Sequence, residues 1–102
     1  MSTATETPVL SLAETTPLGP LVVGPTLVGV DFLGSPIIRS TVRNRSSKPV
    51  DALLVAHLAG GGSKAVASLA LRAIEPGESR RVELMCPAAI TPTALHWTFD
   101  AL

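Results

Sequence analysis

The clearest pattern in the sequence is an alternation of apolar and polar residues over positions 37–45, which positions 79–86 repeat. A strand places successive side chains on opposite faces, so a period of two predicts a β-strand with one buried and one wet face. The predicted inward residues are Ile38, Ser40, Val42 and Asn44 in the first segment and Val82 and Leu84 in the second. The predicted outward residues are Arg39, Thr41, Arg43, Arg45, Arg81 and Glu83.

Turn residues divide the rest of the chain into short elements. Gly24-Pro25 splits a β-rich stretch in two, while AGGGS at 59–63 predicts a hairpin loop and EPGES at 75–79 a type II turn. Residues 64–74 are rich in Ala and Leu, but they follow the hairpin signal, so we interpret them as a strand. The predicted strands cover 21–32 in two parts, 37–45, 50–58, 64–74, 79–86 and 94–102.

This spacing predicts an all-β domain, specifically an immunoglobulin-like β-sandwich of six to seven antiparallel strands. Residues 1–19 are rich in Thr, Ser and Pro and form an extended N-terminal arm in this interpretation, with the sandwich over residues 20–102. The arm's TPVLSLA segment could add a strand to its own sheet or to the sheet of a neighbouring molecule. The arm residues expected to contact a partner are Pro8, Val9, Leu10 and Leu12.

The stretch from Ile37 to Leu84 resembles bacterial immunoglobulin-like modules of the FxLYD and CARDB-like kind. The residues that carry the resemblance are IIRSTVRNRSSKPVDALLVAHLAGGGSK, followed by IEPGESRRVEL. They contain an alternating strand ending in Asn, a polar turn leading to Pro-Val, an apolar strand, a Gly-rich hairpin and a Pro-Gly-Glu turn. Where the family carries its aromatic-acidic signature, this chain reads AHLAGGG. The resemblance implies the fold and an adhesion or scaffold role, mostly outside the cytoplasm.

Charge is unevenly distributed, although the formal net charge is zero. All eight basic residues lie within 39–81 with three acidic ones, a net charge of +5, whereas residues 1–38 carry three acidic and no basic residues. A basic body and an acidic arm favour head-to-tail contact between copies; the alternative is that the charges only solubilise strand faces. Without an overall basic excess we expect no nucleic-acid partner. The body residues expected to contact a partner are Arg39, Arg43 and Arg45.

Catalytic and metal-binding patterns are weak. GGGSK lacks the Gly-Lys-Ser/Thr order of a phosphate-binding loop. His57, His96 and Cys86 could supply zinc ligands only if three strands brought them together, and nothing around Cys86 suggests an activated nucleophile. Trp97 and Phe99 share one face of the last strand, where core packing is expected. We therefore expect no enzyme activity, no metal and no cofactor.

The single cysteine cannot form an internal disulfide, and the first 16 residues lack the basic and apolar regions of a signal peptide. No window has 18 apolar residues, so no membrane span is expected. These features favour a structural assembly protein made in the cytoplasm, with a phage capsid decoration or cement protein as the specific hypothesis. Its partner would be a capsid or other assembly subunit, and the chain would be homo-oligomeric or lattice-bound. The alternative is a cell-envelope or surface adhesion module, which would act outside the cytoplasm.

Overall fold

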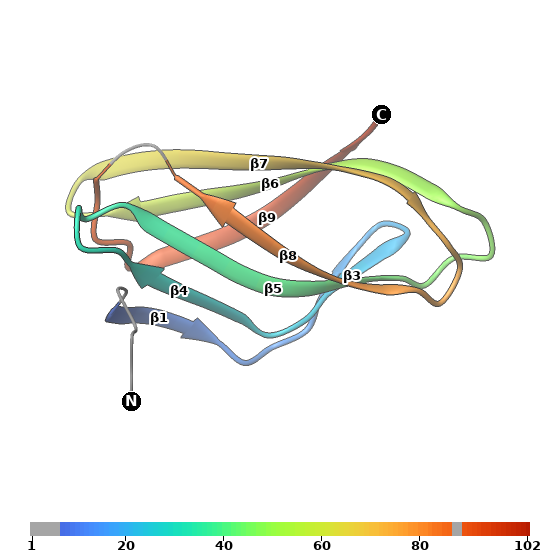
Figure 1. Ribbon diagram of the computed structural model, residues 1–102, viewed down its shortest axis with the longest axis horizontal. Coiled ribbons are helices and arrows are strands. Elements are labelled where there is room, and N and C mark those ends of the chain that lie inside the picture. The colour runs from blue at the N-terminus through green and yellow to red at the C-terminus, as the bar shows by residue number, and fades with distance from the viewer. Residues whose placement is uncertain (1–6, 87–88) are drawn as a thin grey trace.

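A computed structural model of the chain describes residues 7–86 and 89–102, which form nine strands and contain no helix. The strands run along the long axis of a flattened molecule with two layers (Figure 1). They are β1 (Thr7–Leu12), β2 (Thr16–Leu18), β3 (Leu21–Val23), β4 (Thr26–Val30), β5 (Pro36–Asn44), β6 (Val50–Gly60), β7 (Ser63–Ile74), β8 (Ser79–Met85) and β9 (Ala94–Ala101).

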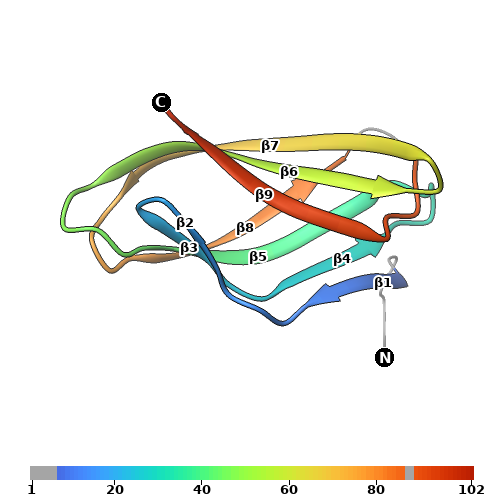
Figure 2. The same cartoon turned by 180° about the vertical axis from the view of Figure 1, so that it is seen from behind.

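The strands pair into two antiparallel sheets. In the six-stranded sheet, β8 pairs with one edge of β5, while β3 and β4 share its other edge and are flanked in turn by β2 and β1. The three-stranded sheet has the order β7-β6-β9. Gly24-Pro25 separates β3 from β4, so these two behave as one interrupted strand, as the sequence predicted. The prediction of an all-β antiparallel sandwich is confirmed (Figures 1 and 2).

The alternating pattern of β5 determines which side chains face the other sheet. Ile38 and Val42 are fully buried, while Arg39, Thr41 and Arg43 are exposed, which confirms the predicted faces. The pairing of Ile38 with Leu84 in β8 extends this apolar inner face across the sheet. Burial of such side chains contributes about 1.5–3 kcal/mol each to the stability of the fold. The apolar inner face that the alternation produces therefore stabilises the packing of one sheet on the other.

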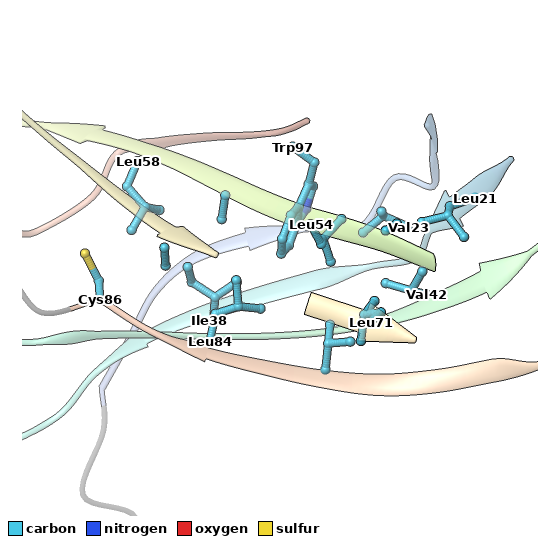
Figure 3. Packing of buried hydrophobic residues seen from close by; sticks show 14 of the residues in the cluster. Leu21, Val23, Ile38, Val42, Leu54, Leu58, Leu71, Leu84, Cys86 and Trp97 are labelled. Atoms are coloured by element: carbon cyan, nitrogen blue, oxygen red, sulfur yellow. The ribbon is translucent and has the colours of Figure 1, made fainter. Parts of the chain in front are cut away.

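The core lies between the two sheets and is built from aliphatic side chains around a single tryptophan (Figure 3). Trp97 projects from β9 beside Leu54 of β6, and both are buried. The indole Nε1–H of Trp97 donates to Thr26 Oγ1 at 3.3 Å, and the Thr26 hydroxyl lies 3.1 Å from Ser40 Oγ. The polar groups of Thr26, Ser40 and Trp97 are thus hydrogen-bonded to one another, as burial requires.

The turn between β7 and β8 follows the predicted type II geometry. Gly77 has φ +78°, and the N–H of Glu78 donates to the carbonyl of Glu75 at 2.9 Å. The Glu78 carboxylate accepts from the Glu75 N–H at 2.8 Å and from Arg80 Nη2 at 2.8 Å. The Glu75 N–H, followed by the Arg80 guanidinium, holds the pKa of Glu78 below its usual value. Arg80 also donates to the Arg72 carbonyl, so this cluster ties β7 to β8.

Residues 7–12 and 16–18 of the predicted arm form β1 and β2 within the chain's own six-stranded sheet. This is the first of the two pairings left open by the sequence, and residues 1–6 of the arm lie outside the described residues. The turn after β2 passes close to the Phe99 side chain of β9. A Cβ added to Gly19 in this turn would lie 2.4 Å from Phe99 Cζ. Gly19 has φ +62°, a conformation that favours glycine, and a side chain at this position would also have to displace the Phe99 ring.

Candidate protein-binding surface

The outer face of the six-stranded sheet carries a cluster of arginines, which we call the basic face: Arg39, Arg43 and Arg81. Arg39 and Arg43 project from β5, four residues apart and therefore on the same side of the strand. Arg81 of β8 pairs with Thr41, which lies between them on β5. The antiparallel pairing of β5 with β8 thus brings Arg81 beside Arg39 and Arg43, from which it is far apart in the sequence.

One carboxylate compensates part of this positive charge. Glu83 of β8 is opposite Arg39, and Glu83 Oε2 lies 2.6 Å from Arg39 Nε. Both side chains are about half exposed, and an ion pair of this kind contributes only about 0.2–1 kcal/mol because water screens it. Within residues 7–86 and 89–102, Arg43 and Arg81 make no side-chain hydrogen bond or ion pair. The basic face therefore presents donors for an acidic partner.

A shallow groove of about 440 Å³ runs over the basic face between β5 and β8. Its walls are formed by residues 39–41 and 81–83. Two large apolar side chains are exposed on the same side of the sheet: Leu27, which pairs with Arg39, and Met85, which pairs with Ile37, two residues before Arg39 on β5. A surface that combines arginine and methionine has the composition typical of protein interfaces.

The structure does not bring all the predicted contact residues onto this face. Arg45 lies just beyond β5, and its Nε–H donates to the carbonyl of Gly19 at 2.9 Å. Leu10 is half-buried and packs against the core, while Leu12 is half-buried opposite Thr26. The backbones of Pro8 and Val9 lie in β1 at the irregularity in its pairing with β4. Only Arg39 and Arg43 of the predicted set therefore belong to the basic face.

Arg81 belongs to the basic face but was absent from the predicted contact set. Its outward orientation follows from the alternation in residues 79–86, and that part of the prediction is confirmed. What the sequence did not reveal was that β8 pairs with β5, since the two strands are separated by the whole β6–β7 hairpin. Strand pairing at long sequence separation was the missing information.

Two of the three residues considered as zinc ligands do meet. His57 of β6 and His96 of β9 are directly opposite on the outer face of the three-stranded sheet, and their rings stack with centroids 4.5 Å apart. His57 Nε2 lies 2.9 Å from Thr98 Oγ1. Cys86 is buried in the core with a free thiol, so it does not join them. In the part of the chain that the structure describes, no group of three or more potential ligands could hold a metal ion.

Among the described residues there is no helix long and apolar enough to cross a membrane. The resemblance of residues 37–84 to FxLYD and CARDB-like modules stays a prediction. No protein-family model, curated protein or solved structure matches the chain.

Proposed function

We propose that the chain is a non-enzymatic assembly protein that binds a protein partner through the basic face. The observation that carries the proposal is the pair Arg43 and Arg81, which are exposed and project from neighbouring strands of one sheet. Guanidinium groups bind carboxylates in a bidentate geometry, and their planar shape makes this recognition specific. The expected partner surface therefore offers aspartate or glutamate side chains.

The apolar groups beside the arginines favour a folded protein as partner over a small anion. Leu27 and Met85 expose 41% and 60% of their surface on the same side of the sheet. Their burial would add a hydrophobic contribution of about 25 cal/mol for each Å² removed from water. A small anion would use the charges and leave this area exposed.

The specific form that we propose is a phage capsid decoration or cement protein, whose partner is a capsid subunit and which acts in the virion. A compact sandwich with a charged outer face and a short N-terminal segment suits attachment to a repeating lattice. The alternative, an adhesion module of the cell envelope, rests on the resemblance of residues 37–84. Both forms use the same basic face, so they differ in the partner and not in the binding surface.

The test is co-sedimentation of the purified protein with virions and, separately, with envelope fragments from its source. We expect the wild type to sediment with virions and the variant Arg43→Glu/Arg81→Glu to stay in the supernatant. The control Lys64→Glu/Arg72→Glu makes the same change in net charge on β7, in the other sheet, and should still sediment. Sedimentation should weaken as salt is added, since the contacts are solvent-exposed ion pairs.

Each outcome of this experiment has a defined meaning. Equal sedimentation of both charge variants would overturn the role of the basic face. Binding to envelope fragments and not to virions would favour the adhesion form, and binding to neither would refute the assembly proposal.

The contribution of the N-terminal arm is tested in the same assay. A deletion of residues 1–19 would remove β1 and β2, and would thus damage the six-stranded sheet itself. A deletion of residues 2–6 leaves both strands in place. If the arm contacts neighbouring subunits, this shorter deletion should reduce sedimentation without changing the thermal stability. Unchanged sedimentation would refute the arm's role.

A further inference from the structure

The free edge of β9 differs from the other sheet edges in the structure. β9 pairs with β6 on one side, and none of the described residues pairs with its other side (Figure 2). Proteins usually protect such edges with charged side chains, prolines or interruptions, because an exposed edge is a template for another strand. The other edges carry these features: Arg81 and Glu83 in β8, Lys64 and Arg72 in β7, and Pro8 and Pro17 in the interrupted pair β1 and β2.

β9 has almost none of this protection. Its eight residues, ALHWTFDA, contain no lysine, arginine, proline or glycine, and the only carboxylate is Asp100. Beside its first half lies a groove of about 370 Å³, with Leu95 and Trp97 on one side and Leu12 and Thr16 on the other. An incoming strand thus has room to approach this part of the edge.

The order of residues in β9 is complementary to itself in the antiparallel direction. When two copies of β9 are aligned antiparallel about Thr98, Trp97 is opposite Phe99, and His96 is opposite Asp100. Aromatic pairs, threonine pairs and opposite-charge pairs are the cross-strand pairs that stabilise antiparallel sheets. The alignment also preserves the faces, because His96, Thr98 and Asp100 are all exposed and point away from the core.

We propose that β9 pairs with β9 of a second copy of this chain, with Thr98 on the two-fold axis. The pairing joins the two three-stranded sheets into one continuous sheet of the order β7-β6-β9-β9-β6-β7. Such an interface is isologous, the arrangement found in most symmetric dimers. The histidine imidazole donates an N–H to a carboxylate in either protonation state, so each His96 can bind Asp100 of the second copy. This inference goes beyond the proposed function, since it uses the opposite sheet from the basic face.

The first test exchanges the charges across the interface. His96→Glu places a carboxylate opposite Asp100 of the second copy, and Asp100→Lys places an ammonium opposite His96. Because the interface contains each pair twice, either change should weaken dimerisation about tenfold in sedimentation equilibrium. The double variant His96→Glu/Asp100→Lys restores opposite charges and should dimerise like the wild type. A double variant as weak as the single ones would overturn the proposed register.

The second test traps the pair covalently. Residues opposite each other in an antiparallel pair have Cβ atoms about 4.5–5.5 Å apart, close to the separation in a disulfide. Thr98→Cys should therefore form a disulfide-linked dimer under mild oxidation. The matched control is Ser68→Cys, since Ser68 and Thr98 are both exposed and flank Val55 from opposite sides. Cys86 is buried and should not react.

The outcomes separate this inference from the proposed function. Dimerisation of the wild type, with Thr98→Cys linking much faster than Ser68→Cys, supports pairing through β9. A wild type that stays monomeric over the whole concentration range, or equal linking of the two cysteine variants, overturns it. Neither result depends on Arg43 or Arg81, so sedimentation with particles still decides the role of the basic face.

Discussion

The hydrogen bonds of Asn44 join several segments at one end of the sandwich, and replacing this residue tests how much they stabilise the fold. The residue is fully buried at the end of β5. Its Nδ2 group donates to the carbonyls of Lys48 and Ile74, at 2.7 and 2.8 Å. Its Oδ1 accepts from the backbone N–H and the hydroxyl of Ser46, at 2.8 and 2.7 Å. One amide thus links β5, the β5–β6 turn and the end of β7.

Replacing Asn44 by Ala removes all four hydrogen bonds, but their costs differ. The carbonyl of Ile74 belongs to a fully buried residue and loses its partner away from water, whereas Lys48 is exposed and Ser46 partly so. A stranded buried acceptor costs about 1–3 kcal/mol, and a bond whose partner regains water about 0.5–1.5 kcal/mol. The lower bounds for one stranded acceptor and three bonds whose partners regain water add up, so we expect Asn44→Ala to lower the free energy of unfolding by at least about 2.5 kcal/mol, out of the about 5–15 kcal/mol typical of a domain.

Urea denaturation followed by the fluorescence of Trp97, the only tryptophan, measures this change directly. A loss of that size lowers Tm by at least about 10 °C in a domain of this length. Ser46→Ala is the matched control, because it removes the hydroxyl hydrogen bonds and keeps those from Asn44 Nδ2. Its cost should be about 1 kcal/mol. A change of less than about 0.5 kcal/mol for Asn44→Ala, the range of an ordinary surface substitution, would refute the reasoning.

Two further predictions concern a close backbone approach and an acid-range pH dependence. Gly60→Ala should destabilise the fold strongly in a thermal melt, because its Cβ would lie 2.1 Å from the Thr91 carbonyl oxygen. The control is Gly62→Ala, where no atom lies near the added Cβ but φ is +78°; it should lower the free energy of unfolding by only about 1–2 kcal/mol. The pKa of Glu78 is lowered from 4.5 by the hydrogen bonds described above, so its stabilising contribution is present above that pH and lost as the pH falls through the lowered pKa. Glu78→Gln should therefore be less stable than the wild type at neutral pH, and the difference between their urea midpoints should shrink in acid; an equal difference at both pH values would contradict this.

The sequence predicted the local structure well, because local structure depends on neighbouring residues. The alternation around Val42 indicated which side chains are buried, and Pro76-Gly77 indicated the turn. Neither pattern contains information about which strands pair at a distance. The position of Arg81 beside the β5 arginines and the stacking of His57 with His96 depend on sheet order and register, which emerge only when the whole core packs.

The N-terminal residues are a second case in which the sequence did not determine strand pairing. Their Thr, Ser and Pro content is typical of disorder, yet Leu10 and Leu18 pack against the core. Composition describes a segment averaged over its length, whereas pairing with β4 requires only that alternate residues fit an available edge. The sequence of the arm contains no information about the edge of β4 with which it pairs.

The position of β6 between β7 and β9 has a consequence for synthesis on the ribosome. Residues 50–74 leave the exit tunnel as a complete hairpin well before residues 94–101 supply the strand that covers the other side of β6. Until then the β6 edge of this hairpin has no partner strand, and its apolar residues are not covered by Trp97. Chains with such an exposed edge aggregate readily. Nascent chains that stall before residue 94 should thus require chaperone protection, and the domain becomes self-sufficient only once its last strand has been made.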